Sequence, residues 1–218
     1  MKKQAHSLLS THAIELTGQR SYWGALTHSE SALAIANFVH EHNNLIVIIT
    51  ENSQKANHLE ESLGFFIDKN IDVLNFPEWE TLPYDRFSPH QDIVSERLKT
   101  LYRLPSVTQG VLIVPVANMM QKVVPLDYIQ QYSFVLNVGD TLEVEKFSQQ
   151  LEAGSYQRVG QVYEHGEFAV RACIIDLFPM GSKTPFRIDL FDDEVETIRN
   201  FDPETQRSIE QISSIELL

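Results

Sequence analysis

Apolar residues in the first half of the chain follow two alternating patterns. Short apolar runs rich in β-branched residues occur at 45–49, 71–76 and 111–114, between polar or glycine residues. Such runs predict buried strands of a parallel sheet. Apolar residues recur at helical spacing over 28–43, 53–63 and 91–104, and a further helix is expected to begin near 118. The alternation predicts an α/β domain over residues 1–125, preceded by a loosely held arm over 1–20.

Local signals predict where two of these helices begin and end. Thr27 and Glu30 have the spacing of a capping box, which is typical of a helix start. Gly64 follows the apolar positions of the second helix and is expected to end it.

The second half has a different pattern. A strand is expected at 134–138 and a helix at 143–153, and short strand candidates follow near 158–163, 168–178, 186–191 and 195–201. One helix against a small antiparallel sheet predicts an α+β domain over residues 126–205, between Pro125 and Pro203. Residues 206–218 are expected to return as a strand into the α/β domain.

The strand at 186–191 separates two kinds of side chain. Alternation places Phe186, Ile188 and Leu190 on one face, and Arg187, Asp189 and Phe191 on the other. An antiparallel neighbour over 171–178 would bring Arg171 towards the charged face. Arginine beside an aromatic residue is the composition of a binding hot spot, but a solvated face with one stray phenylalanine fits the pattern equally well. Phe191 could also cover a second core.

Composition narrows the class of partner and compartment. The chain has 218 residues, a net charge of −13 and a pI near 5.0, so it is poorly suited to hold a phosphate backbone and better suited to a basic protein partner. Cys173 is the only cysteine, which excludes disulfides and CxxC metal sites, and we expect it to be a buried small hydrophobe. Without a signal peptide or an apolar run long enough to cross a membrane, we expect a cytoplasmic protein with no membrane partner.

Candidate chemistry is sparse. A phosphate loop would lie just ahead of the first helix, but the sequence at 22–30, YWGALTHSE, has one glycine and no lysine, so Walker A chemistry is missing. No nucleotide or other cofactor is expected. Asp85, His90 and Asp92 could be imagined as metal ligands, although loop hydrogen bonds explain them better. His165 and Glu167 suggest acid/base work only weakly, because no nucleophile accompanies them, and a turn is preferred.

Several long strings carry a family resemblance. They are WETLPYD at 79–85, FSPHQDIVSERLKTLY at 87–102, GVLIVPV at 110–116, EHGEFAVR at 164–171, DLFPMGS at 176–182 and FDDE at 191–194. In this order they closely resemble the N-terminal, UvrB-like region of the bacterial transcription-repair coupling factor (Mfd). The resemblance covers nearly the whole chain and is weakest over residues 1–40.

The resemblance implies a fold and a function. The fold would be α/β: a degenerate helicase-like, P-loop NTPase-like domain without Walker A, carrying an inserted small α+β domain, as in UvrB. The inserted domain would bind UvrA through Arg171, Arg187 and Phe191, which match the family's contact positions. The chain would be a non-catalytic fragment, and a distal domain would mask this surface in the full protein, an ATP-dependent DNA translocase. RNA polymerase and DNA would be bound by parts absent here. The alternatives are a cryptic nucleotide-binding or DNA-binding domain.

Overall fold

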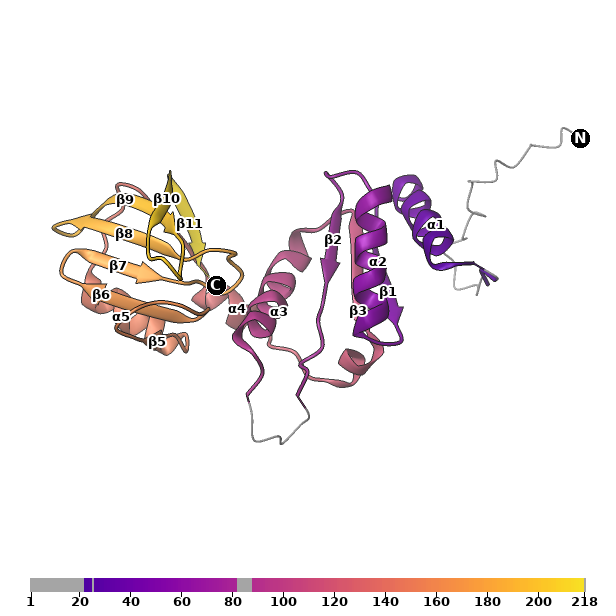
Figure 1. The fold of residues 1–218 in the computed structure, drawn as a ribbon, viewed down its shortest axis with the longest axis horizontal. Coiled ribbons are helices and arrows are strands. Elements are labelled where there is room, and N and C mark those ends of the chain that lie inside the picture. The colour runs from indigo at the N-terminus through magenta and orange to yellow at the C-terminus, as the bar shows by residue number, and fades with distance from the viewer. Residues whose placement is uncertain (1–21, 25, 82–87, 218) are drawn as a thin grey trace, which may run out of the picture. The chain divides into compact units, whose positions relative to one another are not determined.

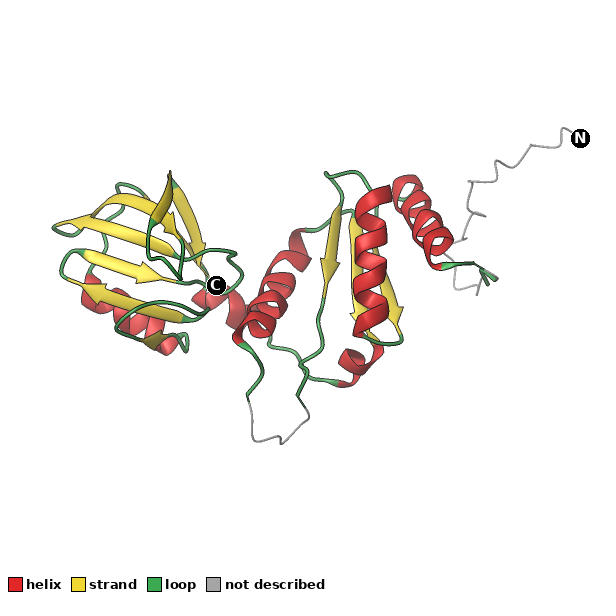
Figure 2. Cartoon of the chain, viewed as in Figure 1, coloured by secondary structure: helices red, strands yellow, loops and turns green. Residues whose placement is uncertain are grey.

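The computed structural model describes residues 22–24, 26–81 and 88–217 (Figure 1). The arm expected over 1–20 lies outside these residues. The chain divides into two compact units, the first made of residues 1–78 and 104–121 and the second of residues 79–103 and 122–218. Helices and strands alternate in the first unit, whereas the second is dominated by antiparallel strands (Figure 2).

The first unit is built on a parallel sheet of three strands. Their order is β1-β3-β2, with bounds Leu45–Thr50, Gly110–Pro115 and Asp72–Asn75. Helices α1 (His28–Glu41) and α2 (Ser53–Phe66) pack against one face of this sheet. The core between them holds Ala32, Ala36, Val39, Ala56, Leu63, Val111 and Ile113. The predicted parallel α/β layer is therefore present, since each strand connects to the next through helical segments.

Strand β1 differs from its prediction in burial. The order β1-β3-β2 leaves β1 with a single neighbour, whereas β3 lies in the centre and is buried along its whole length. Ile46 and Ile48 face the helices, but Val47 and Ile49 are 52% and 55% exposed on the other face. An apolar run thus indicated the strand correctly, but could not show that it lies at an edge.

The helix boundaries show which local signals were reliable. The Thr27–Glu30 capping box is formed, with the Glu30 carboxylate accepting from the Thr27 amide at 2.7 Å. Gly64 does not end α2, which continues to Phe66. Residues after β3 form a short 3₁₀ helix, η2 (Val116–Met120), instead of the α-helix expected near 118. The next α-helix, α4 (Leu126–Tyr132), begins only after Pro125, a residue suited to a helix start.

The second unit is an antiparallel sheet of six strands with helices and a small two-stranded sheet. The six strands have the order β10-β9-β8-β7-β6-β5, in which only β5 and β6 are parallel. Their bounds are β5 Gln157–Arg158, β6 Glu167–Arg171, β7 Ile174–Leu177, β8 Phe186–Phe191, β9 Glu194–Phe201 and β10 Ser208–Ile212. Strands β4 (Phe134–Asn137) and β11 (Ser214–Leu217) form the smaller sheet. The helices of this unit are α3 (Gln91–Arg103), α4 and α5 (Val144–Ala153). A short 3₁₀ helix, η1 (Leu104–Ser106), directly follows α3 and belongs to the first unit.

One face of the six-stranded sheet forms the main core. Helix α5 contributes Phe147 and Leu151, and strands β4 and β11 contribute Leu136, Ile215 and Leu217. The sheet contributes Phe168, Ile175, Leu177, Ile188, Leu190, Val195 and Ile198. These residues alternate within β7 and β8, and a register shift in the β8–β9 pair keeps Val195 and Ile198 on the same face, so the main core occupies one face of the sheet only.

The chain after Pro203 does not follow the expected path. Strand β10 pairs with β9, and β11 pairs with β4, so both strands belong to the second unit and do not enter the parallel sheet. Residues 79–103, which contain α3, also group with the second unit. Both differences have the same cause: β-pairing and helix packing join residues far apart in sequence, and periodicity carries no information about which partner is chosen.

Two glycines should respond oppositely to alanine. Gly64 lies inside α2, and an added Cβ would meet nothing within 4 Å. We expect Gly64→Ala to raise the free energy of unfolding by about 0.5–1 kcal/mol, because helical glycine loses more entropy on folding. Gly166 has φ +77°, a left-handed conformation, so Gly166→Ala should lower it by about 1 kcal/mol. Urea denaturation measures both, and equal effects of the same sign would contradict this account of the backbone.

Candidate functional site

The candidate site is the face of the six-stranded sheet that points away from the main core, hereafter the outer face. Strand pairing defines it, because directly paired residues of an antiparallel sheet point to the same side. One row of paired residues runs from Arg171 through Ile174 and Asp189 to Thr197. The neighbouring row runs from Ala169 through Asp176 and Arg187 to Arg199. Phe191 follows Asp189 on the same side of β8.

Phe191 is the most exposed large hydrophobic residue of the outer face. It ends β8, directly before the turn Asp192–Asp193 that leads into β9, and its side chain is 70% exposed. Asp192 has φ +52°, a backbone conformation that tight hairpin turns use. The ring therefore does not cover a second core, and of the alternatives left by the sequence the exposed anchor remains. The acidic turn itself is exposed, as a solvated turn should be.

Arg171 lies at the end of β6 and is also exposed. Its Nη2 donates a hydrogen bond to the carbonyl of Gly160, in the loop that follows β5. This single contact orients the side chain, and the other guanidinium N–H groups meet no acceptor among the residues that the structure describes. Arg171 is thus an exposed cation with unused donors, which suits recognition of a carboxylate.

Arg187 occupies a different environment. Its Nε and Nη2 donate to the two carboxylate oxygens of Asp176 at 2.7 and 2.8 Å, and Nη1 donates to the carbonyl of Gln206 at 3.2 Å. The guanidinium also lies over the Phe201 ring, 4.8 Å from its centroid. Hydrogen bonding to Asp176 raises the pKa of Arg187 above its ordinary value. The Arg187 side chain is 17% exposed and that of Asp176 is 2% exposed, so the pair is largely withdrawn from solvent.

The structure therefore brings Arg171, Arg187 and Phe191 onto one face but exposes them unequally. The end of the outer face near Arg187 is covered by the loop after β5. There Val159 and Val162 pack with Ala169, Phe178 and Phe201 in a second small core. The remaining, open part of the outer face consists of Arg171, Ile174, Asp189, Phe191, Thr197 and Arg199.

Sequence reasoning missed Arg199 as a member of this face. Its guanidinium is bonded to the Asp189 carboxylate, which also accepts from the Thr197 hydroxyl at 2.6 Å. The Arg199 side chain is 39% exposed, more than twice the value of Arg187. Alternation along β9 could have suggested Arg199, but a register shift between Asp189 and Leu190 breaks the simple count from the turn.

Cys173 is exposed, so the prediction that it is a buried small hydrophobe was wrong. It lies with Ala172 in the turn between β6 and β7, where Ala172 has φ +49°. An apolar neighbourhood in sequence suggested a strand interior, but the reversal of direction places Cys173 at the tip of a hairpin. Cys173 therefore lies two residues after Arg171, in the turn that connects β6 to β7.

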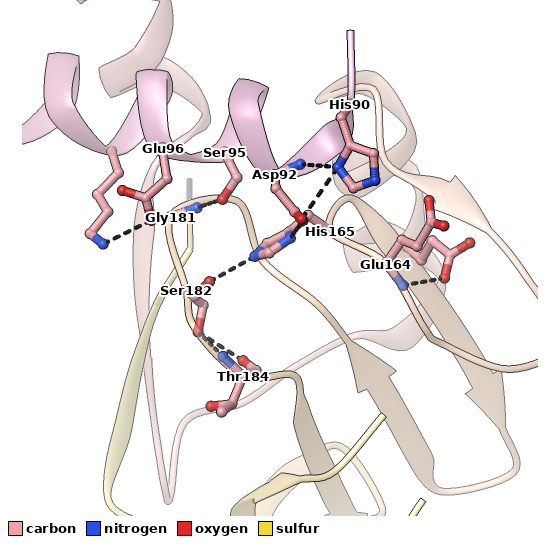
Figure 3. Close-up of polar contacts among 11 residues, drawn as sticks. His90, Asp92, Ser95, Glu96, Glu164, His165, Gly181, Ser182 and Thr184 are labelled. Atoms are coloured by element: carbon pink, nitrogen blue, oxygen red, sulfur yellow. Dashed lines mark hydrogen bonds and ion pairs between the residues drawn. The ribbon is translucent and has the colours of Figure 1, made fainter. Parts of the chain in front are cut away.

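A cluster of hydrogen bonds joins α3 to the loops that flank the sheet (Figure 3). His165 Nδ1 lies 2.8 Å from Asp92 Oδ1, and its Nε2 lies 2.8 Å from the carbonyl oxygen of Ser182. The amide of Gly181 donates to the hydroxyl of Ser95 at 2.7 Å. His165 thus has a structural position with its side chain 13% exposed, which agrees with the turn preferred over acid/base chemistry.

Tyr156 also binds the 179–185 loop, which contains Gly181 and Ser182. The amide of Met180 donates to the Tyr156 hydroxyl at 3.0 Å, and burial raises the pKa of that hydroxyl to about 12. With His165 and Ser95, this contact fixes the 179–185 loop at the start of β8. The loop therefore helps to set the position of the strand that carries Arg187 and Phe191.

Neither a metal-ligand cluster nor a membrane-spanning helix is found among the residues that the structure describes. Within residues 22–24, 26–81 and 88–217, no three His, Cys, Asp or Glu side chains gather as metal ligands. Asp85, one of the imagined ligands, lies outside this set, while Asp92 is bonded to His165. None of the helices in the same residues is long and apolar enough to cross a bilayer.

Comparison with known proteins identifies what the second unit resembles. Residues 134–218 match the protein family described as "UvrB interaction domain". That segment contains β4, α5 and every strand of the six-stranded sheet, so the outer face lies wholly within it.

The whole chain is similar to bacterial transcription-repair-coupling factors. It is 45% identical to that of Haemophilus influenzae over 195 residues and 43% identical to that of Escherichia coli K12 over 201 residues. It is 33% identical to that of Staphylococcus aureus Mu50 over 192 residues. These alignments cover 89%, 92% and 88% of this chain but only 17%, 17% and 16% of the relatives. The predicted resemblance is confirmed, and the chain spans about a sixth of the length of these relatives.

Proposed function

We propose that this chain is a non-catalytic module that recruits UvrA in transcription-coupled nucleotide excision repair. The observation that carries the proposal is the 70% exposure of Phe191 on the outer face, within the segment that matches the UvrB interaction domain. An exposed phenylalanine in a short turn-flanked strand contributes little to its own fold. It is suited to fill an apolar pocket of a partner, where aromatic residues often dominate the binding energy.

The proposed UvrA-binding residues are Arg171, Arg187 and Phe191. Phe191 supplies the apolar anchor, and Arg171 supplies hydrogen-bond donors for a carboxylate of the partner. Arg187 belongs to the set through its ion pair with Asp176, which holds β7 and β8 together beneath the contact surface. A partner of this chemistry presents an apolar pocket bordered by acidic side chains.

The first unit has the proposed role of a degenerate helicase-like scaffold without nucleotide chemistry. In a P-loop protein the N-terminus of the first helix faces phosphate. Here that helix, α1, begins with the capping box, and hydrogen bonding to Thr27 lowers the pKa of the Glu30 carboxyl. A carboxylate at this position repels phosphate, which supports a non-catalytic role.

The longer relatives set the proposed context. Because the chain spans about a sixth of their length, contacts with RNA polymerase and DNA are assigned to segments beyond this one. In such a full-length protein, located in the cytoplasm, we propose that a distal domain covers the outer face until it is needed. Release of that domain would then make the UvrA site available.

Calorimetric titration of UvrA into the whole chain tests the proposed function. We expect saturable binding that remains when ATP is withheld, since the chain itself contributes no nucleotide chemistry. Absence of binding heat over a wide range of UvrA concentrations would contradict the proposal. An ATP-dependent rise in the melting temperature of the chain alone would instead favour the nucleotide-binding alternative, and salt-dependent affinity for duplex DNA would favour the DNA-binding alternative.

A further inference from the structure

We infer that Arg199 presents a further guanidinium to the partner, in addition to the proposed UvrA-binding residues. This inference deepens the proposed function and rests on it. It assigns a contact residue outside the set that the family resemblance implies.

The first step is that the position of Arg187 is fixed within the fold. Three of its five guanidinium N–H groups already donate, two of them to Asp176 and one to the Gln206 carbonyl. If Arg187 swung outward to a partner, the Asp176 carboxylate would remain buried without its cation, which is strongly unfavourable. The Phe201 ring on one side of the guanidinium further restricts the movement. Arg187 therefore stays in place when a partner binds.

The second step is that Arg199 has donors available. It pairs directly with Arg187 across β8 and β9, so it lies on the outer face in the next strand. Within the described residues, Asp189 is the single acceptor that its guanidinium meets, through Nη2, and its Nε is buried without a hydrogen-bond partner. With 39% of the side chain exposed, part of the guanidinium fork remains open to a second carboxylate.

The third step is the spacing. Arg199 is level with Arg187, which is four residues before Phe191 on β8, so Arg199 and Phe191 lie about 13 Å apart along the strands. Arg171 lies three strands away and one row along, which places it about 16 Å from Arg199. Arg171, Arg199 and the protruding Phe191 ring thus form a triangle within an area that a standard interface, about 800 Å² per partner, can cover.

Asp189 gives this arrangement a further property. Its carboxylate neutralises Arg199 in the free protein and lies between Arg199 and the Phe191 end of the strand. A partner carboxylate at Arg199 would therefore compete with the charge of Asp189. Removing that charge should strengthen binding, whereas removing Arg199 should weaken it.

A matched pair of substitutions tests the inference by calorimetry of the whole chain with UvrA. We expect Arg199→Ala to weaken binding about tenfold, because one charged contact is lost. Asp189→Asn should strengthen binding, since the amide oxygen can still accept from Thr197 while Arg199 is released. If Arg199 acted only through its ion pair with Asp189, both substitutions would weaken binding to the same extent, and the inference would be overturned.

Two further variants separate this inference from the proposed function. Arg171→Ala should weaken binding whether or not Arg199 makes contact. Loss of affinity in Arg171→Ala together with full affinity in Arg199→Ala would overturn the inference and leave the proposed function intact. Full affinity in both would contradict the proposed binding face itself. Circular dichroism of each variant shows whether the sheet is retained, and Arg199→Lys should restore part of the affinity only if the charge meets the partner.

Discussion

Replacing Arg187 with alanine is expected to lower the free energy of unfolding of the second unit by about 3–5 kcal/mol. The substitution leaves the Asp176 carboxylate, whose side chain is 2% exposed, without the two hydrogen bonds that it accepts from Arg187. An unpaired buried charge is among the most destabilising defects that a single substitution can create. Hydrogen exchange of the β7 and β8 amides measures the loss within this unit without assuming that both units unfold together.

A double substitution separates the ion pair from the rest of the fold. Asp176→Leu combined with Arg187→Met removes both charges and keeps apolar volume on the outer face, so it should recover most of the stability lost in Arg187→Ala. Stability of Arg187→Ala equal to that of the unsubstituted chain would show that the pair does not hold the sheet.

Phe191→Ala is expected to weaken UvrA binding by about 2 kcal/mol or more, which is roughly a thirtyfold loss of affinity. The unfolding free energy should change by less than about 0.5 kcal/mol, because the ring is 70% exposed and supports no core. The expected result is therefore a binding defect without a stability defect.

Phe65 provides the matched control for this prediction. It lies in α2 of the first unit and is 84% exposed, so Phe65→Ala removes an equally accessible ring far along the sequence from the outer face. Its affinity for UvrA should equal that of the unsubstituted chain. Equal losses in the two variants would mean that binding depends on exposed apolar surface in general and would contradict a specific anchor at Phe191.

Much of the fold could be predicted because local patterns specify local structure. The capping box at Thr27 and Glu30, the apolar run of β3 and the alternation of β8 each depend on neighbouring residues, and each is found in the structure. Alternation also predicted correctly that Arg187, Asp189 and Phe191 share a face. These features follow from helix and strand periods alone.

What could not be predicted depends on pairing between distant segments. Val47 and Ile49 are exposed because helices α1 and α2 cover the opposite face of β1, and the pairing of β11 with β4 joins residues about 80 apart in sequence. The same holds at the candidate site. The family resemblance implied that Arg187 is a contact, but only the position of Asp176 on the neighbouring strand shows that its guanidinium already forms an ion pair. Arg199 was missed because its place on the outer face depends on the pairing of β9 with β8, which contains a register shift.

The most direct test of the central claim is calorimetric titration of UvrA with the double variant Arg171→Ala, Phe191→Ala. Both residues are exposed on the outer face, and neither takes part in the main core, so the variant should fold normally. The account predicts no measurable binding heat at UvrA concentrations that saturate the unsubstituted chain. Unchanged affinity in the folded double variant would contradict the claim that this face binds UvrA.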